Sequence, residues 1–348
     1  MFENRNSKTH LSDLGEFGLI ERLTKNIKLV NESSILGVGD DCAVIDAKDK
    51  QIIVTTDMLV EGIHFDISYT PLKHLGYKAV AVNLSDIAAM MGRPTQITVS
   101  MALSSKYTLE AIEEIYVGMR LCCKQYGVDL VGGDTSSNTT GLVISITAIG
   151  LVDKDKFVKR STAKEGDLVC LSGNTGAAYM GLLLLQREKE AWKANPNLQP
   201  DLEGNDYVLE RCLKPEPRLD IVQLLNEKGI QPTSMIDVSD GVASEIKHIC
   251  AKSNVGCALY EDKLPIDPVT NINAELFKIS AVTAALNGGE DYELLFTVKQ
   301  DDYPKIKVLE QISIIGHITE VNSGVNLITR DNALIPIRAQ GWDAFKKD

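Results

Sequence analysis

The sequence predicts an α+β protein of two domains, an N-terminal mixed sheet covered by helices on one face and a C-terminal α+β domain, with the functional site between them. At 348 residues the chain is longer than one hydrophobic core usually supports. Strand and helix patterns are interleaved along it rather than separated. The charged connection 153–161 marks the boundary, so we expect one domain over 1–152 and another over 153–348.

Composition narrows the class of protein. A net charge of −12 argues against a nucleic acid or an anionic membrane as partner. No apolar run approaches the ~20 residues that span a bilayer, and no signal-peptide core follows Met1, so we expect a cytoplasmic protein. The seven cysteines are odd in number, scattered and without a Cys-x-x-Cys pair. We therefore expect buried thiols, not disulfides or a zinc site.

Near the N-terminus a helix is expected over 16–29, followed by two short apolar strands over 42–45 and 52–54. The carboxylates of Asp40 and Asp41 precede the first strand, and the second strand ends on the hydroxyls of Thr55 and Thr56 and the carboxylate of Asp57. A hairpin of these strands would bring three carboxylates together, and such a cluster repels itself by a few kcal/mol unless a cation is bound. Oxygen ligands favour magnesium over zinc. The residues concerned are Asp40, Asp41, Thr55, Thr56 and Asp57.

The apolar segment from Pro71 to Met91 predicts a helix. Asp86 falls on the same helical face as Leu75, Ala79, Val82 and Met90, and an ionised carboxylate buried there is costly unless it is paired or bound to metal. Asn83 and Ser85 beside it add further oxygens, so a metal ligand is the favoured interpretation. The alternative is a position at the rim of the helix, where it meets water.

The rest of the first domain alternates strand and helix. We expect strands over 96–103, 128–131 and 142–150, with a helix that begins at Thr108. The strand over 128–131 leads into Gly132-Gly133-Asp134-Thr135, which places one more carboxylate at a strand end beside permissive glycines.

In the second domain, Asp237-Val238-Ser239-Asp240-Gly241 follows a strand and opens a helix at Val242. Backbone N–H groups at that start could face a phosphate. The loop Ser172–Ala177 follows a strand over 168–171, but it lacks the lysine of a P-loop, so we interpret it as an ordinary strand-to-helix turn. The other expected elements are a helix over 218–228 and strands over 293–298, 312–318 and 325–329.

One Gly-Asp pair is usually only a turn, but five separate carboxylate centres are harder to explain as turns. These centres are Asp40 with Asp41, Asp57, Asp86, Asp134, and Asp237 with Asp240. His64 lies seven residues after Asp57, and a structural role and a substrate contact are both open for it. His10, His74, His248 and His317 are isolated. No nucleophile elbow or catalytic triad is visible. Many metal-binding carboxylates without a nucleophile or base favour direct phosphoryl transfer to an acceptor that is already anionic.

Six motifs stand in order along the chain: Gly-Val-Gly-Asp-Asp-Cys-Ala (37–43), Thr-Thr-Asp-Met-Leu-Val-Glu-Gly-Ile-His-Phe (55–65), Ala-Val-Asn-Leu-Ser-Asp-Ile-Ala-Ala-Met (81–90), Gly-Gly-Asp-Thr (132–135), Asp-Val-Ser-Asp-Gly (237–241) and Gly-Gly-Glu-Asp-Tyr-Glu-Leu (288–294). With these motifs the chain resembles, from about Glu16 to Phe345, the thiamine-monophosphate kinase family, within the aminoimidazole-ribonucleotide-synthetase-like superfamily. The resemblance implies ATP-dependent phosphorylation of thiamine monophosphate to thiamine diphosphate, several magnesium ions, and a homodimer whose N-terminal sheets pair.

The resemblance also implies roles for single residues. Arg160 would offer a donor fork to phosphate oxygens, and Trp342 a ring face to a thiazolium cation; without the resemblance, a solvated arginine and a core tryptophan are the simpler interpretations. Magnesium would be held by Asp41, Thr55, Thr56, Asp57, Asp86, Asp134, Asp237 and Asp240. ATP would contact Tyr116, Gly133, Asp134, Arg160 and Ser239, and the thiamine phosphate would contact His64, Glu290 and Trp342.

Two other functions stay open. The chain could be another ATP-dependent enzyme of the superfamily, of the synthetase type, or a non-catalytic nucleotide- or divalent-ion-binding protein. A selenide enzyme would need a cysteine in its N-terminal segment, and residues 1–20 contain none. A hydrogenase-maturation relative would end in a cysteine-bearing tail, whereas this chain ends Phe345-Lys346-Lys347-Asp348.

Overall fold

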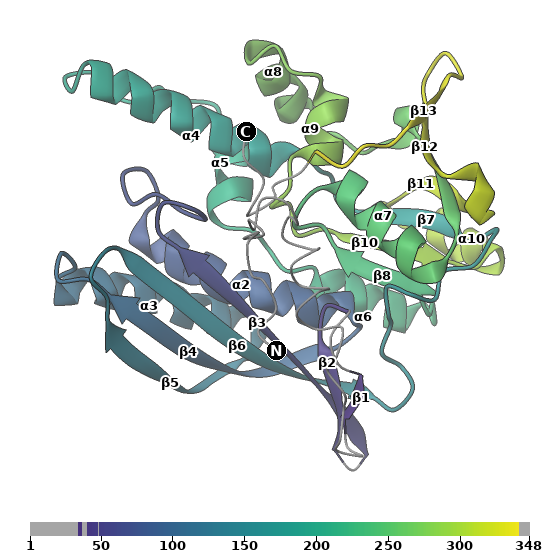
Figure 1. Ribbon diagram of the computed structural model, residues 1–348, viewed down its shortest axis with the longest axis horizontal. Helices are drawn as coiled ribbons and strands as arrows, with labels where there is room; N and C mark the ends of the chain where they lie inside the picture. Colours follow the sequence, from purple (N-terminus) through teal and green to yellow (C-terminus); the bar gives the residue numbers. More distant parts are fainter. Residues whose placement is uncertain (1–33, 37–39, 48, 341–348) are drawn as a thin grey trace, which may run out of the picture.

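The computed structural model describes residues 34–36, 40–47 and 49–340, which form two β-sheets with helices packed against them (Figure 1). The predicted α+β class is confirmed. The expected helix over 16–29 and the candidate Trp342 lie outside the described residues. Within the described part, no helix is both long enough and apolar enough to cross a membrane. All seven cysteines are free and buried, as predicted.

The first sheet has six strands in the order β1-β2-β3-β6-β4-β5. Neighbouring strands are antiparallel except β4 and β5, which are parallel, so the sheet is mixed as predicted. The predicted succession of strands and helices is also found. The strands are β1 (Ser34–Leu36), β2 (Ala43–Ala47), β3 (Lys50–Val60), β4 (Arg93–Leu103), β5 (Asp129–Ser137) and β6 (Leu142–Asp153).

Two predicted strand ends were wrong. β3 does not end at Asp57, because its pairing with β6 continues from Asp57↔Ile146 to Val60↔Val143. β5 likewise continues through the glycine pair, with Asp134 opposite Ser100 of β4. In both strands the backbone ladder to a neighbouring strand continues past the polar residues, because polar side chains alone do not end a strand.

Helix α2 (Leu72–Ala89) is buried on nearly every side and crosses the centre of the molecule (Figure 1). Its Leu75 and Ile87 belong to the core under the first sheet, whereas Ala88 and Ala89 belong to a core of the second domain. A helix that packs on both sides shows no single apolar stripe. α2 is therefore the element through which the two halves meet.

Helix α3 (Leu109–Tyr126) packs beside α2 and begins where the sequence predicts, because the Thr108 hydroxyl accepts a hydrogen bond from the Ala111 N–H at 3.3 Å. Glycines allow the two helices to approach closely. A Cβ atom at Gly76 would lie 1.9 Å from the carbonyl oxygen of Ile115. Only glycine fits there, so the position of α2 is fixed closely.

The second sheet has seven strands in the order β13-β12-β9-β11-β7-β10-β8, so that β8 forms the edge nearest α2. Its strands are β7 (Leu168–Ser172), β8 (Ser234–Asp237), β9 (Gly256–Tyr260), β10 (Leu294–Val298), β11 (Ile312–Thr319), β12 (Val325–Ile328) and β13 (Leu334–Pro336). Its helices are α4 (Ala177–Ala194), α5 (Asp206–Leu213), α6 (Leu219–Glu227), α7 (Val242–Ser253), α8 (Pro268–Leu276), α9 (Ala281–Asn287) and α10 (Tyr303–Ile306).

Candidate functional site

Three carboxylates from distant parts of the chain converge between the two halves. Asp41 precedes β2, Asp86 lies on α2, and Asp237 ends β8. One oxygen from each lies within 4.8 Å of the others. The hairpin of β2 and β3, the central position of α2 and the end of β8 bring them together, and their role as cation ligands stays a prediction.

Polar neighbours orient these carboxylates. The Thr55 hydroxyl donates to Asp86, and the Ser85 hydroxyl donates to Asp237 Oδ2 at 2.6 Å. The side-chain oxygen of Asn83 accepts the backbone N–H of Asp57 at 3.0 Å. Asn83 and Ser85, expected to add oxygens beside Asp86, therefore bind the neighbouring acidic residues.

The cluster is electrostatically unfavourable without a cation. Burial raises the pKa of Asp86 well above its ordinary value, and the charges of Asp57, Asp237 and Asp41 raise it further. Burial, then the charge of Asp237, raises the pKa of Asp57 to about 6. Carboxylates so placed must either take up protons or bind a cation.

Arg160 lies beside this cluster and is only 16% exposed, so a solvated linker arginine is excluded. Its guanidinium pairs with Asp41, and its backbone N–H donates to Asp40 Oδ1 at 2.9 Å. Two buried polar atoms here have no hydrogen-bond partner in the structure, Asp41 Oδ2 and Arg160 Nε. An unpaired carboxylate oxygen suits a hard cation and an unpaired guanidinium N–H suits a phosphate oxygen, so these residues fit magnesium and a phosphorylated ligand.

Two motifs that are far apart in the sequence pair through their backbones. The N–H of Glu290 donates to the Ser239 carbonyl at 2.7 Å, and the N–H of Tyr292 donates to the Val238 carbonyl at 2.9 Å. Glu290 and Tyr292 both have left-handed backbones, with φ of 59° and 51°. Such conformations are strained for residues other than glycine and gather at functional sites. The turn 288–293 is therefore built against the segment that carries Asp237.

Two acidic residues of this turn have structural roles. Asp291 accepts the N–H groups of Gly176 at 2.7 Å and Ala178 at 3.2 Å, and so occupies the start of α4. The loop before α4 is thus a strand-to-helix turn, as the sequence predicts. Glu293 is buried and accepts from Ser172, Arg211 and Arg218.

Glu245 was not predicted from the sequence. It is 2% exposed, and its Oε1 accepts the backbone N–H of Asp240 at 2.8 Å. Burial raises its pKa well above the ordinary value, and the charge of Asp240 raises it further. The signal was present, since Glu245 falls beside Val242 and Ile249 on the apolar face of α7, the same pattern that singles out Asp86.

Comparison with known proteins decides the family. The family model for AIR synthase related protein, N-terminal domain, matches residues 39–152, and the model for its C-terminal domain matches 164–327. The thiamine-monophosphate kinase of Bacillus subtilis is 36% identical over 345 residues, covering 96% of this chain and 100% of the relative. The chain belongs to the thiamine-monophosphate kinase family.

Solved structures of the family agree with this fold. AaThiL complexed with AMPPCP and TMP matches with a TM-score of 0.82 at 31% identity, covering 97% of this chain and 99% of that one. Thiamine monophosphate kinase from Aquifex aeolicus matches with a TM-score of 0.76 at 29% identity, covering 94% and 100%.

Some residues singled out by the family resemblance lie away from the carboxylate cluster of the same chain. Thr56 is exposed, and its hydroxyl donates to the Ile146 carbonyl at 3.0 Å on the outer face of the first sheet. Gly133 and Asp134 lie on β5, three strands and roughly 14 Å from β3. Tyr116 packs against the first core from α3. Their roles stay predictions.

The other predicted residues lie at or beside the site. Asp240 and the exposed Ser239 occupy the turn between β8 and α7, next to Asp237. His64 lies in the turn after β3, where its Nδ1 accepts the Val60 N–H at 3.0 Å. Glu290 pairs with Lys78 of α2 at 2.5 Å.

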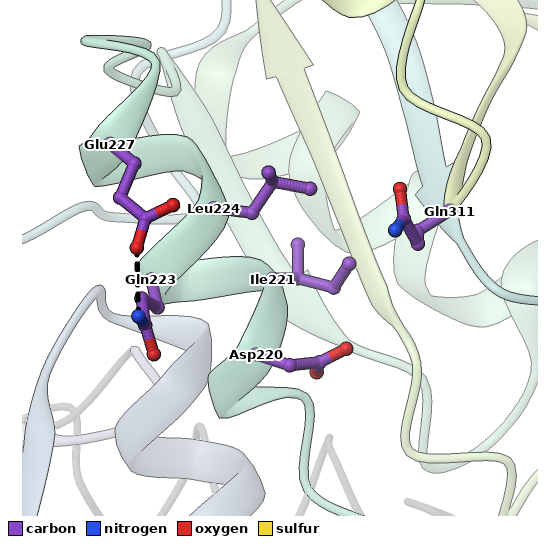
Figure 2. A pocket seen from close by; sticks show the side chains of 6 residues that line it. All are labelled: Asp220, Ile221, Gln223, Leu224, Glu227 and Gln311. Carbon is purple, nitrogen blue, oxygen red and sulfur yellow. Dashed lines mark hydrogen bonds between the residues drawn. The ribbon is translucent and has the colours of Figure 1, made fainter.

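A hollow beside α6 is separate from this site. Three of its polar side chains are already engaged, since Gln223 donates to Glu227 at 2.7 Å (Figure 2) and Asp220 pairs with Arg218. It shares no residue with the carboxylate cluster, and we assign it no role. Its lining consists of Asp220, Ile221, Gln223, Leu224, Glu227 and Gln311.

Proposed function

We propose that the chain catalyses ATP-dependent phosphorylation of thiamine monophosphate to thiamine diphosphate, a transfer from one phosphate group to another. The observation that carries this is the converged set Asp41, Asp86 and Asp237 in a chain whose full-length relatives are thiamine-monophosphate kinases. The structure of AaThiL with AMPPCP and TMP supports a site that takes a nucleotide and a second phosphorylated ligand together.

Several magnesium ions belong to the proposal and, when bound, would supply the positive charge that phosphoryl transfer needs and that this chain, with a net charge of −12, lacks. Arg160 forms ion pairs with Asp40 and Asp41, and its Nε lies 3.5 Å from Asp40 Oδ1 without a hydrogen bond, so the guanidinium can orient a phosphate oxygen. The ligands we propose for magnesium are Asp41, Thr55, Thr56, Asp57, Asp86, Asp134, Asp237 and Asp240.

We propose direct in-line transfer without a phosphorylated enzyme. The nearest thiol, Cys42, is 2% exposed, and its Sγ donates to the Asp86 carbonyl at 3.4 Å. Burial and the surrounding carboxylates raise its pKa well above the ordinary value, so the nucleophilic thiolate is disfavoured. His64 uses Nδ1 to accept a backbone N–H, which leaves that nitrogen unable to attack. Positioning and charge neutralisation then provide the catalysis.

A homodimer with paired N-terminal sheets is also part of the proposal. Every residue of β5 is exposed, including the apolar Leu130 at 38% and Val131 at 58%. Among the described residues this nine-residue edge has no strand on its outer side, and such an edge offers free backbone groups with which a second chain can pair. Such pairing would cover Gly133 and Asp134, which lie away from the carboxylate cluster of their own chain. We also place the protein in the cytoplasm, in keeping with its seven free thiols.

The test is ADP release by the purified full chain with ATP and Mg²⁺, with and without thiamine monophosphate. We expect release that depends on thiamine monophosphate and Mg²⁺, with thiamine diphosphate formed in equal amount. A synthetase would release ADP only with a different acceptor, and a binding protein would not turn over. Isolation of a phosphorylated side chain during turnover would exclude direct transfer.

A further inference from the structure

Lys78 is a buried lysine for which the proposed mechanism gives no role. It lies on α2, its side chain is only 6% exposed, and its Nζ donates to Glu290 Oε2 at 2.5 Å and to the Cys212 carbonyl at 3.3 Å. Three separate segments therefore meet at one ammonium group: α2, the end of α5 and the turn 288–293. Burial lowers the pKa of Lys78, but the charges of Glu290 and Cys212 and the hydrogen bond to Glu290 together outweigh burial and raise it.

The position of Lys78 on α2 relates it to the carboxylate cluster. Lys78 and Ser85 are seven residues apart, so they share one face of the helix and are separated by about 10 Å along it. Ser85 holds Asp237 of the cluster, and Lys78 holds Glu290. One helical face thus fixes both ends of an elongated site.

Tyr292 lies between these two ends. Its ring is buried, and its hydroxyl lies 3.5 Å from Glu290 Oε1. Its backbone N–H donates to the carbonyl of Val238, the residue after Asp237, at 2.9 Å. Tyr292 therefore connects the segment that carries Asp237 with Glu290. Burial raises the pKa of its phenol, and the charges of Glu290, Asp57 and Asp237 raise it further.

The Glu290 side chain is arranged to meet a ligand. It is 33% exposed, unlike the buried Lys78, and Lys78 occupies only Oε2. Oε1 accepts the Tyr292 hydroxyl at 3.5 Å and retains a second lone pair to accept a further hydrogen bond or to face a cation. Its left-handed backbone is a strained arrangement that a purely structural ion pair would not require.

We propose that Lys78 is a positioning residue for the acceptor substrate: it fixes the Glu290 carboxylate about 10 Å along α2 from the carboxylate cluster, where the organic, cationic part of the acceptor lies. This inference rests on the proposed function. It assigns the cluster to the phosphate end of thiamine monophosphate and Glu290 to the other end. Lys78 acts through Glu290 and does not touch the reacting phosphates.

The first test is steady-state kinetics of Lys78→Met, Glu290→Gln and the double variant. We expect the KM for thiamine monophosphate to rise at least tenfold in each, with the KM for ATP changed less than twofold. Because Lys78 acts through Glu290, the KM of the double variant for thiamine monophosphate should be no higher than that of Glu290→Gln. The matched control is Lys73→Met, which changes an exposed lysine on the same helix and should leave both KM values at the wild-type level.

A second test does not depend on turnover. Calorimetric titration of thiamine monophosphate should show the same tenfold weakening in Lys78→Met. If Lys78→Met fails to fold, the double variant, which leaves no unpaired charge, replaces it in both tests.

Three results would overturn the inference. The first is a lower denaturation midpoint for Lys78→Met with normal affinity for thiamine monophosphate, which would make Lys78 purely structural. The second is a KM for thiamine monophosphate that is tenfold higher in the double variant than in Glu290→Gln, which would mean that Lys78 acts on its own. The third is an equal increase in KM for ATP and for thiamine monophosphate in Lys78→Met. A wild-type chain without ADP release dependent on thiamine monophosphate would instead overturn the proposed function itself.

Discussion

The Ser85 hydroxyl on α2 donates a hydrogen bond to Oδ2 of Asp237 at the end of β8, across 2.6 Å. Both side chains are buried. Burial raises the pKa of Asp237, and the bond from Ser85 acts in the opposite direction by stabilising the ionised form. A residue of the first domain thus holds a candidate metal ligand of the second, and the geometry of the cluster depends on how the domains pack.

We expect Ser85→Ala to raise the Mg²⁺ concentration needed for half-maximal activity by about 10–100-fold, the usual effect of removing a hydrogen bond that orients a metal ligand. The measurement is the initial rate against Mg²⁺ at saturating ATP. The control is Ser234→Ala at the other end of β8, where the buried hydroxyl has no hydrogen-bond partner in the structure. An equal Mg²⁺ requirement in Ser85→Ala and wild type would show that the Ser85 hydrogen bond does not orient a metal ligand.

We expect Asp57→Asn to keep the fold but to abolish Mg²⁺-dependent turnover. The pKa of Asp57 is raised from 3.8 to about 6, first by burial and then by Asp237. A raised pKa in the folded state stabilises the metal-free protein fully below about pH 4, and this stabilisation is lost as the pH rises through about 6. Urea unfolding without metal should therefore give a smaller decrease in stability between these pH values for Asp57→Asn. Turnover at the wild-type rate would remove Asp57 from the site.

The sequence predicts these residues to different degrees. Asp86 follows from helical spacing alone, and Asp237 from a strand end that the structure confirms. Asp57 lies beside the cluster although its predicted strand end was wrong, because Asn83 of α2 accepts its backbone N–H. The pairing of Lys78 with Glu290 could not be predicted, since the two are 212 residues apart and meet only through domain packing. Local periodicity contains no information about such contacts.

We expect Glu245→Gln and Glu245→Ala to differ in stability. Burial, then the charge of Asp240, raises the pKa of Glu245 well above its ordinary value, so ionisation of this carboxyl destabilises the metal-free fold at high pH. Glutamine is neutral and still accepts the Asp240 N–H, so it should be at least as stable as wild type at pH 8. Alanine offers that N–H no acceptor, so it should lower the free energy of unfolding by about 1–3 kcal/mol. Urea unfolding checks this, and a glutamine variant less stable than the alanine variant would contradict it.

We expect Arg160→Met to raise the KM for ATP by about 10–100-fold, because hydrogen bonds to charged groups contribute about 1.5–3 kcal/mol. Asp41 would then be a buried carboxylate without its cation, so stability should fall more at pH 8 than at pH 5. Rates against ATP and thermal melts at the two pH values provide the measurements. Lys159→Met, the neighbouring cation, serves as control. An unchanged KM for ATP would show that Arg160 is only the partner of Asp41.

We expect Val131→Lys to halve the molar mass measured by light scattering on a size-exclusion column. Val131 is 58% exposed on the edge strand β5, and a lysine there is the usual means by which a sheet edge avoids pairing with another chain. Val308→Lys is the matched control, since Val308 is 66% exposed on the second domain, away from the first sheet. If Val131→Lys keeps the wild-type mass, or if wild type is already a monomer, the sheets do not pair through β5. A monomeric Val131→Lys that keeps full activity would show that Gly133 and Asp134 are not needed from a paired chain.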